Sequence, residues 1–329
     1  MKLAIVILNW NGEALLKKFL PSVIEHSGEA DIYVADNAST DGSVEFIKAN
    51  FPSVNIIQNG ENGGYAKGYN DALKHVGADV FCLLNNDVEV TENWLDPIVV
   101  EFQNHPETAI VQPKILDYRN KTCFEYAGAA GGFIDKLGYP FCRGRIFNTI
   151  EQDKGQFNDT ADIFWVSGAC MFIKKDVFDT LGGFDETFFA HMEEIDLCWR
   201  AFNLGLKSKY IGASIIYHVG GATLQSNNPQ KTYFNFRNSL FALVKNAHGN
   251  LFMLVLARLI LDGVAGLKFL LELKPRHTLA VLRSHCSFYA QLARLLRVRK
   301  ASVKRKKYYK TGSIVVSYYL KNCKTFNCL

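Results

Sequence analysis

The sequence predicts an α/β fold with a doubly wound, mainly parallel sheet. Over the first 90 residues, short apolar runs alternate with stretches of helical periodicity, and the links between them are short. Such alternation is typical of strand–helix–strand units, because parallel strands need a crossover connection. Three of the predicted strands end in Asn or Asp. Open α/β sheets bind their ligands at that edge, so the pattern also predicts where a site lies.

The N-terminal elements follow one another in the order that such a sheet requires. The helix predicted at residues 44–50 has a plausible side-chain cap in Ser43 or Thr40. The predicted strands are residues 3–8, 31–35, 54–58 and 79–84, and the predicted helices are residues 14–25, 44–50 and 65–76.

The end of the fourth strand is the most informative point of the chain. Four consecutive apolar residues indicate a strand buried on both faces, and Asn85, Asn86 and Asp87 follow it directly. A carboxylate flanked by two carboxamides suits a hard divalent cation that carries phosphate oxygens. The alternative is a turn without a ligand, since the same residues favour turns.

Beyond residue 113 the alternation becomes irregular. Residues 122–159 are rich in Gly, and we expect a long excursion that covers a site. Regular elements return as a strand over residues 163–174 with a kink at Gly168, helices over 177–181 and 193–204, and a strand over 209–217.

Several classes of protein are disfavoured by what the sequence lacks. It has no Gly-x-Gly-x-x-Gly after the first strand and no Gly-x-x-x-x-Gly-Lys-Ser/Thr, which disfavours a nicotinamide-dinucleotide enzyme and a P-loop phosphotransferase. Its eight cysteines form no Cys-x-x-Cys pair, so most are expected to be free thiols, among them the core residues Cys82 and Cys198. No signal segment precedes the first strand, so we expect a cytoplasmic body.

Charge is unevenly distributed along the chain. Residues 268–329 contain 15 of the 37 Lys and Arg residues but one of the 32 Asp and Glu residues. A basic tail indicates an anionic partner, and its many apolar side chains favour a membrane surface over nucleic acid. The apolar run 251–271 is interrupted by Arg258, Asp262 and Lys268, which predicts an interfacial helix instead of a spanning one. A solvated tail packed on the body is the alternative.

Eight short motifs along the chain form the pattern of a known family. The chain resembles family 2 glycosyltransferases of the GT-A fold, especially the rhamnosyltransferase-like enzymes of bacterial surface-polysaccharide assembly. The resemblance implies a catalytic domain at residues 1–225 and a helical, basic, membrane-associating region at residues 226–329. The motifs are Asn9-Trp10-Asn11-Gly12, Asp36-Asn37-Ala38-Ser39-x-Asp41-Gly42-Ser43, Asn62-Gly63-Gly64-x3-Gly68-x-Asn70, Asn85-Asn86-Asp87, Gly168-Ala169, Gly182-Gly183-Phe184-Asp185-Glu186, Glu193-Glu194-x-Asp196-Leu197-Cys198-x-Arg200 and His218-x-Gly220-Gly221.

The chemistry that the resemblance implies is transfer of a sugar, with inversion, from a dTDP- or UDP-linked donor to a hydroxyl of a lipid-linked glycan. The leaving diphosphate needs a divalent cation, Mn²⁺ or Mg²⁺, and Asp87 and His218 are the implied ligands. Asn85 replaces the first acid of the family's usual Asp-x-Asp, and a single imidazole suits Mn²⁺ best. A hydrogen-bonded surface role is the alternative for His218.

The resemblance also implies a set of residues that bind the nucleotide sugar. Asp36 is expected to bond the nucleoside, although it could instead cap the following helix. Gly63 and Gly64 would let backbone approach the nucleotide closely. The full predicted set is Asn9, Asn11, Asp36, Asn62, Gly63, Gly64, Asn70 and Asn86.

An inverting displacement needs a base that accepts the proton of the acceptor hydroxyl. The resemblance assigns this role to Glu194, with Glu193 next, although two acids at a helix start can also serve only its dipole. Asp196 is expected to orient the site or to pair with Arg200, four residues on. Trp165, Gly168 and Arg200 are candidates for the wall of the acceptor or sugar site, with a core position as the alternative for Trp165.

Two other functions compete with this prediction. A sugar nucleotidyltransferase would need a Gly-rich signature with Arg or Lys after the first strand, which residues 9–12 lack. An inactive scaffold of the same fold is supported only by Asn85 and Glu194, where the family more often has Asp. We expect an active enzyme at the inner face of the cell membrane.

Overall fold

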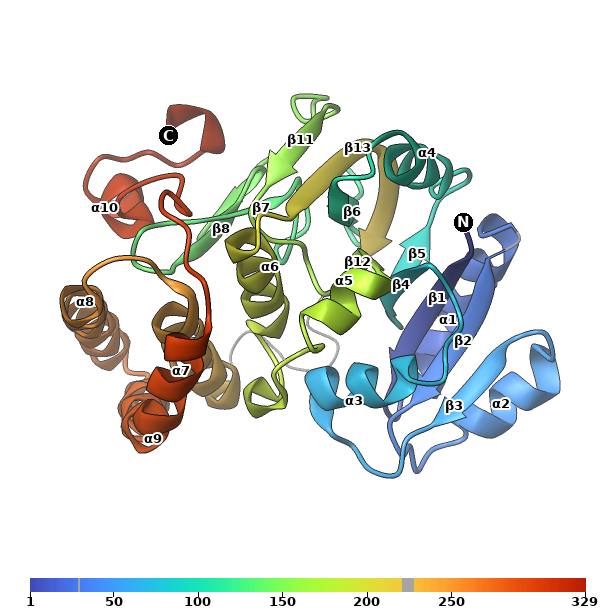
Figure 1. The fold of residues 1–329 in the computed structure, drawn as a ribbon, viewed down its shortest axis with the longest axis horizontal. Helices are drawn as coiled ribbons and strands as arrows, with labels where there is room; N and C mark the ends of the chain where they lie inside the picture. The colour runs from blue at the N-terminus through green and yellow to red at the C-terminus, as the bar shows by residue number, and fades with distance from the viewer. Residues whose placement is uncertain (29, 221–227) are drawn as a thin grey trace.

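The computed structural model describes residues 1–28, 30–220 and 228–329 and confirms the α/β class (Figure 1). Its centre is a sheet of nine described strands, and a second sheet of four short strands lies beside it. The helices of the C-terminal hundred residues gather at one end of the molecule, and β3 (Asn55–Gln58) and α2 (Ser43–Asn50) lie at the other.

The N-terminal half of the central sheet is parallel, as predicted. β1 lies between β2 and β4, and β2 pairs with β3, all in parallel register. All but the last residue of β4 are at most 1% exposed, and alternate side chains enter the cores on opposite sides of the sheet. The bounds are β1 Leu3–Asn9, α1 Glu13–His26, β2 Asp31–Asp36, α3 Gly64–Leu73 and β4 Val80–Asn85.

The other half of the sheet is mixed. β12 runs antiparallel between β4 and β6, while β13 is parallel to β6 and carries β11 and β5 as antiparallel neighbours. The bounds are β5 Val88–Val90, α4 Asp96–Asn104, β6 Thr108–Asp117, β11 Thr160–Ile163, β12 Cys170–Lys174, α5 Lys175–Thr180, the 3₁₀ turn Glu186–Phe188, α6 Glu193–Asn203 and β13 Lys207–His218.

The prediction of one kinked strand over residues 163–174 is wrong. The structure has two strands there, β11 and β12. Between them, the backbone amides of Ser167 and Ala169 donate to side chains instead of to a neighbouring strand. The amide of Ser167 donates to the side chain of Gln112 at 2.8 Å, and the amide of Ala169 donates to the Ser167 hydroxyl at 3.2 Å. Polar side chains thus compete with the sheet for these backbone groups.

The predicted cap of α2 is also wrong, because neither Ser43 nor Thr40 caps the helix with its side chain. Asp41 satisfies the turn instead, accepting from the amide of Ser43 at 3.1 Å and from the amide of Glu13 at 3.0 Å. One carboxylate therefore joins the starts of α1 and α2.

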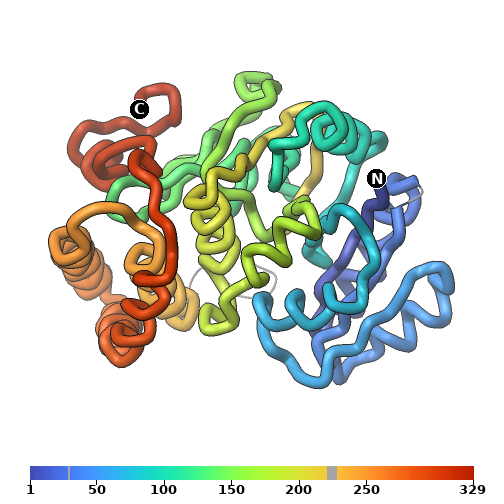
Figure 2. Tube along the Cα trace, in the orientation of Figure 1, coloured from blue at the N-terminus to red at the C-terminus, as the bar shows by residue number. Residues whose placement is uncertain are grey.

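The Gly-rich excursion folds as a small antiparallel sheet, and the C-terminal tail packs on it (Figure 2). The Tyr308 hydroxyl donates to the carbonyl of Lys136 at 2.7 Å, and the amide of Ile314 donates to the Asp135 carboxylate at 2.9 Å. The strands are β7 Gly132–Ile134, β8 Pro140–Cys142, β9 Arg145–Ile146 and β10 Thr149–Ile150.

The C-terminal helices share the main hydrophobic core with the sheet. In α7, Leu240, Phe241 and Leu243 are at most 1% exposed and belong to the cluster that contains residues of β1 and β4. The predicted domain boundary at residue 225, and Gly221 of the last motif, lie outside the described residues. The elements are α7 Pro229–Asn246, α8 Leu251–Leu271, α9 Pro275–Ala301, α10 Ile314–Tyr319 and a terminal 3₁₀ turn Phe326–Cys328.

Two sequence predictions can be checked on this fold. Cys82 and Cys198 are buried free thiols, as expected, whereas Cys323 and Cys328 near the C-terminus form a disulfide that the sequence did not predict. In the described ranges, no helix combines the length and the apolar character that crossing a membrane requires.

Candidate active site

The carboxyl ends of the parallel strands bring the first predicted residues together. The Asn9 side chain, at the end of β1, donates to the Asp36 carboxylate at the end of β2 (3.3 Å). Asn86 follows β4 and donates to the Asn9 side-chain oxygen at 2.8 Å. Asn9 and Asp36 are at most 2% exposed. Three polar side chains thus form one connected row along this edge of the sheet.

The loops after β1 and β2 are joined by Asn11. Its amide donates to the Ser39 hydroxyl at 2.9 Å, and its side-chain oxygen accepts from the amide of Thr40 at 2.7 Å. Asn11 has a φ of 48°, a left-handed conformation that Asn adopts more readily than most residues. The side-chain oxygen is therefore engaged by the protein, and the residue itself is exposed.

A second row of carboxamides extends from the β2 loop to the start of α3. Asn37 is 2% exposed and donates to Asn62 at 3.2 Å and to the carbonyl of Gly64 at 3.0 Å. Asn59 donates back to Asn37 at 2.9 Å. Asn37 lies in one of the motifs, but neither Asn37 nor Asn59 is among the predicted nucleotide contacts. Nothing in the local sequence of either residue indicates such a contact.

Gly64 and Asn70 have structural partners that the sequence did not indicate. Gly64 has a φ of +73°, and a Cβ there would lie 2.4 Å from the carbonyl oxygen of Phe189. The backbone of Gly64 therefore lies close to the loop that contains Phe189. Asn70 donates to the carbonyl of Phe184 and accepts from its amide, both at 2.9 Å, so this side chain anchors the loop before α6.

The two predicted metal ligands lie together in a buried cluster. Nε2 of His218 is 3.1 Å from the carboxylate of Asp87, and Nδ1 is 3.4 Å from the carboxylate of Glu125. All three residues are at most 5% exposed. Glu125 lies in the excursion, in a stretch without a recognisable motif, so the sequence gave no signal for it.

The electrostatics of this cluster favour a positive charge. Burial lowers the pKa of His218, but the carboxylates of Glu125 and Asp87 outweigh burial and raise it to about 10. Burial raises the pKa of Asp87, but the charge and the hydrogen bond of His218 outweigh burial and hold the pKa of Asp87 below its usual value. Without another cation, the imidazolium supplies the positive charge that lies between the two carboxylates.

The residues present fit a divalent cation only in part. In residues 1–28, 30–220 and 228–329, no group of three or more His, Cys, Asp or Glu side chains is arranged to hold a metal. Asp87 and His218 offer two ligands, and Nδ1 of His218 is buried without a hydrogen-bond partner. Mg²⁺ and Mn²⁺ at phosphate sites often take one or two protein ligands and complete their shell with substrate oxygens and water.

The predicted catalytic acids open α6 after a strained turn. Phe189, His191 and Met192 have φ values of 64°, 68° and 73°. Residues other than Gly rarely adopt positive φ, so three such residues within four positions indicate backbone strain. Glu193 is 4% exposed. Within the described chain, Oε2 of Glu193 and Oε2 of Glu194 are buried and accept no hydrogen bond.

Burial changes the acidity of both carboxyl groups. It raises the pKa of Glu193 well above its usual value, and the charge of Glu194 raises it further. Burial also raises the pKa of Glu194, to about 7, although backbone hydrogen bonds oppose this shift. A carboxylate with a pKa near neutrality is well suited to accept a proton in a reaction.

Helix α7 holds the strained turn in place. The buried Asn238 amide donates to the carbonyls of Phe188, Ala190 and His191 at 2.7–3.0 Å. Arg237 donates to the carbonyl of Phe188 at 3.0 Å and to the side-chain oxygen of Asn238 at 2.8 Å. From the other side, the amide of Tyr65 in α3 donates to the carbonyl of Phe189 at 2.9 Å. The turn before Glu193 is thus fixed between α3 and α7.

Asp196 and Arg200 are committed to the scaffold. Asp196 is fully buried and accepts from Arg200 at 2.9 Å, from Lys245 at 2.9 Å and from Asn246 at 2.7 Å. Lys245 and Arg200 outweigh burial and hold the pKa of Asp196 below its usual value. Arg200 also donates to the carbonyls of Leu181 and Gly183. The ion pair four residues apart is present as predicted, and neither side chain is free to form the wall of a site.

Trp165 takes the core position that was its alternative. It is 3% exposed, and its indole N–H donates to the carbonyl of Phe133 at 2.7 Å. The Gly168 carbonyl instead accepts from the Tyr65 hydroxyl at 2.9 Å. Burial raises the pKa of that hydroxyl, and the neighbouring Tyr69, Glu193 and Glu194 add to the shift.

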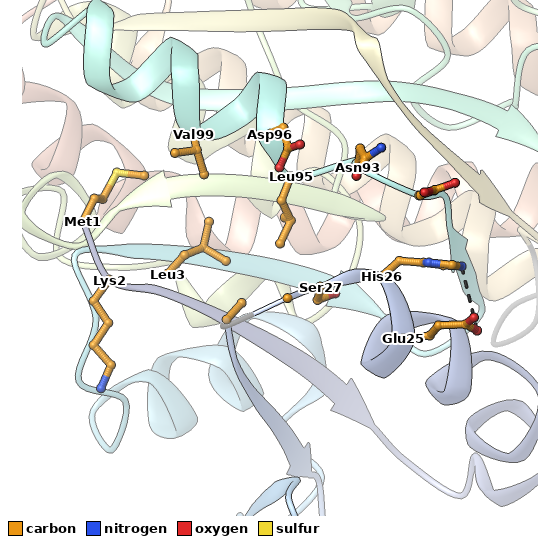
Figure 3. Close-up of a pocket in the computed structure, with 13 residues that line it drawn as sticks. Met1, Lys2, Leu3, Glu25, His26, Ser27, Asn93, Leu95, Asp96 and Val99 are labelled. Atoms are coloured by element: carbon orange, nitrogen blue, oxygen red, sulfur yellow. Dashed lines mark ion pairs between the residues drawn. The ribbon is translucent and has the colours of Figure 1, made fainter.

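A surface hollow of about 900 Å³ lies at the opposite edge of the sheet (Figure 3). It is lined by the start of β1, the end of α1 and the start of α4, including Lys2, His26 and Asp96. None of the predicted site residues lines it. The chemistry-bearing residues lie at the carboxyl edge, which remains the candidate site.

Polar strand ends, a buried carboxylate–imidazole cluster and an acid pair on this sheet are the features of a GT-A glycosyltransferase. A family model for glycosyl transferase family 2 matches residues 4–182 of the 329. The chain belongs to that family and is a glycosyltransferase that uses nucleotide sugars.

Two curated relatives are rhamnosyltransferases. The N-acetylglucosaminyl-diphospho-decaprenol L-rhamnosyltransferase of Mycobacterium tuberculosis is 25% identical over 241 residues, which cover 67% of this chain and 77% of the relative. The dTDP-rhamnosyl transferase RfbF of Shigella flexneri is 24% identical over 257 residues, which cover 73% and 79%. These matches confirm the resemblance to rhamnosyltransferase-like enzymes.

Solved structures confirm the fold. S. aureus TarS 1-349 in complex with UDP superposes with a TM-score of 0.52 at 16% identity, over 82% of this chain and 72% of that one. GalNAc-T7 with UDP, GalNAc and Mn²⁺ superposes with a TM-score of 0.57 at 17% identity, over 74% and 47%. Both support the GT-A architecture predicted from the sequence.

Proposed function

We propose that the protein transfers a sugar, with inversion, from a nucleoside diphosphate to a hydroxyl of a lipid-linked glycan during assembly of a cell-surface polysaccharide. The observation that carries this proposal is the acid pair Glu193–Glu194 at the start of α6, where one buried oxygen of each carboxyl group accepts no hydrogen bond. The turn before this pair is bonded to the start of α3. The same end of α3 is tied through Asn62 and Asn37 to the polar strand ends. Acid pair and nucleotide edge therefore belong to one connected site.

The nucleotide binds along the row of polar side chains. In this proposal, Asp36 and Asn9 contact the nucleoside, Asn11, Asn62 and Asn86 line the pocket, and Gly63 allows a close backbone approach. The donor is linked to dTDP or UDP. The name of the Shigella relative supports the first nucleotide, and the TarS complex supports the second.

Asp87 and His218 are the residues that would hold Mn²⁺ or Mg²⁺. A divalent cation there neutralises the charge that builds up on the leaving diphosphate. The buried carboxylates of Asp87 and Glu125 support this assignment, because a bound cation would supply the positive charge that the His218 imidazolium supplies in its absence. The Mn²⁺ in the GalNAc-T7 and mannosyltransferase PcManGT structures is consistent with it.

Glu194 acts as the general base. Its ionised carboxylate accepts the proton of the acceptor hydroxyl while that oxygen attacks the anomeric carbon opposite the diphosphate, so the configuration inverts. Burial and the charge of Glu194 raise the pKa of Glu193 well above its usual value, which favours the neutral form of Glu193 beside the base.

The acceptor is lipid-linked, which places the reaction at the inner face of the cell membrane. The decaprenol acceptor named for the mycobacterial relative supports this assignment. The basic composition of residues 268–329 supports a membrane-associating role for the region 226–329.

The test is a transfer assay with a panel of dTDP- and UDP-sugars and a polyprenyl-diphosphate-linked sugar acceptor, with Mn²⁺ or Mg²⁺. We expect one donor to give a product whose anomeric configuration, read by NMR, is opposite to that of the donor. Retention of configuration would contradict the mechanism. Absence of nucleotide binding with every donor would favour the inactive scaffold.

A further inference from the structure

Helix α8 exposes an unbroken apolar face to the outside of the protein. It lies at the outer edge of the C-terminal end of the molecule (Figure 1). Apart from Gly263 and Lys268, every exposed residue of this helix is a large apolar one. These side chains are at least 41% exposed: Phe252, Met253, Leu256, Ile260, Val264, Leu267, Leu270 and Leu271.

Of the three charges that interrupt this helix in sequence, Arg258 and Asp262 do not reach its outer face, whereas Lys268 is exposed near its C-terminal end. Arg258 and Asp262 are four residues apart and both point inward, at most 3% exposed. They bond each other at 2.8 Å, Arg258 donates to the Ser239 hydroxyl at 2.6 Å, and Asp262 accepts from the Tyr139 hydroxyl at 2.9 Å. The polar pair of α8 thus faces the protein together with the core residue Leu254, while the exposed side of the helix is apolar apart from Lys268.

The elements beside α8 continue this surface. Lys268 lies 5.3 Å from the ring of Tyr319, which is half exposed, and Leu320 next to it is 80% exposed. At the start of α9, the Thr278 hydroxyl donates to the carbonyl of Gly266, which places this turn against α8. The apolar area is therefore built from three elements, and it is larger than a single helix face.

Helix α9, whose start packs against α8, carries basic side chains that we call the basic border. Arg276 and Arg283 line a small hollow between α9 and the first turn of α7, together with the exposed Leu279. In the described part of the chain, no carboxylate pairs with either guanidinium. The one acid of residues 268–329, Glu272, is taken up by Lys274 at 2.9 Å and Lys268 at 3.8 Å. The border thus carries an excess of positive charge.

We infer that the outer face of α8, with α10 and the first turns of α9, lies on an anionic lipid bilayer. The apolar side chains enter the boundary of the acyl chains, and Arg276 and Arg283 bind lipid phosphates. At 1.5 Å per residue, α8 is about 30 Å long, enough to lie along the interface with its whole length. This inference rests on the proposed function, because it assigns the surface through which the enzyme meets a lipid-linked acceptor.

Co-sedimentation with vesicles tests the surface, using the full-length protein and phosphatidylcholine vesicles with and without phosphatidylglycerol. Replacing Ile260 and Val264 together by Glu should lower binding to the anionic vesicles by about tenfold or more, since charges on the buried face of an interfacial helix oppose insertion. The matched control is Val100→Glu, at a residue 52% exposed on α4, and it should bind like wild type. Unchanged binding of the double variant would overturn the inference.

The basic border is tested in the same assay. Replacing Arg276 and Arg283 by Glu should remove most of the preference for phosphatidylglycerol, whereas replacing Lys17 and Lys18 on α1 by Glu should not. Equal binding of wild type to neutral and anionic vesicles would overturn the inference that Arg276 and Arg283 bind lipid phosphates.

A second copy of the chain is the competing occupant of this face. If light scattering shows a wild-type dimer that the Ile260/Val264 variant converts to a monomer, the face is a contact between chains and the inference is wrong. Nucleotide-dependent thermal shifts of each variant, compared with wild type, separate this surface from the proposed function. If wild type shows no nucleotide-dependent shift but still binds vesicles, the proposed function is contradicted and the inferred lipid-binding surface is retained.

Discussion

At the scale of single residues, the account depends most on the carboxyl group of Glu194. Replacing it by Gln removes the proton acceptor but keeps the size of the side chain, so donor binding should persist while transfer falls by about 10²–10⁴-fold. Turnover assays together with nucleotide titrations measure the two effects separately. Glu193→Gln is the matched control, because it makes the same exchange of a carboxyl for a carboxamide at the neighbouring position, and it should reduce transfer far less.

The pH dependence of transfer follows from the same group. Because burial raises the pKa of Glu194 to about 7, its basic form is scarce in acid and predominates above neutrality. The transfer rate should therefore rise with pH and level off above about 7, and Glu194→Gln should lack this rise. A wild-type profile that is flat between pH 5 and 8, measured at saturating donor, would exclude Glu194 as the base.

The sequence predicted those site residues that stand in short motifs at strand ends. Asn9, Asp36 and Asn86 meet through hydrogen bonds as the parallel order of β1, β2 and β4 requires. Glu125 and Asn238 could not be predicted, because their contacts with His218 and the turn before α6 join parts of the chain that are 93 and about 50 residues apart. Such contacts exist only once the excursion and α7 have folded onto the sheet.

At the scale of elements, the attachment of the α6 turn to α7 makes a separate prediction. Asn238→Ala removes the side-chain donor of the Ala190 and His191 carbonyls, while the Phe188 carbonyl keeps Arg237, and each lost partner costs about 1–3 kcal/mol when its group stays buried. We expect a lower melting temperature and a fall in kcat larger than any change in donor KM, because the turn carries Glu193 and Glu194. Asn235→Ala, on the exposed side of the same helix, should change neither quantity.

The buried ion pair of α8 predicts a large effect on stability. Asp262→Ala leaves Arg258 buried without its carboxylate, and loss of one partner of a buried pair typically costs about 3–5 kcal/mol. Urea denaturation should show this loss in the free energy of unfolding. Lys268→Ala removes an exposed charge of the same helix and should have an effect within about 1 kcal/mol. Similar midpoints for the two variants would contradict the inward orientation of Asp262.

The sequence predicted element types well where the pattern is local and failed where other contacts compete. Residues 163–174 have the composition of one strand, yet Gln112 and Ser167 take amides between β11 and β12. In α8, the charges were interpreted as interruptions of an apolar run. The spacing of four residues between Arg258 and Asp262 places these two on one face of a helix, which a count of charges along the sequence does not show.

At the scale of the whole molecule, the C-terminal region is part of the folded enzyme. Helix α7 packs into the core of the sheet, and the tail contributes Tyr308 and Ile314 to the excursion. Removing residues 251–329 would therefore destabilise the protein as well as remove the proposed lipid-binding surface. Point variants on exposed faces distinguish membrane binding from folding more cleanly than truncation does.

The proposed mechanism requires Asp87, at the end of β4. In this mechanism Asp87 binds the donor diphosphate through a divalent cation, and the base on α6 belongs to the same site. The most direct measurement is the shift in melting temperature with a panel of nucleoside diphosphates, with Mn²⁺ or with a chelator, for wild type and Asp87→Asn. A ligand that binds only the native state stabilises it by about 2.7 kcal/mol at 100 times its Kd.

We predict that dTDP or UDP raises the melting temperature of wild type, that chelation removes most of this shift, and that Asp87→Asn behaves as if chelated. The control variant Asp162→Asn, at an exposed carboxylate of β11, should respond like wild type. An equal, metal-dependent shift in Asp87→Asn would contradict the account.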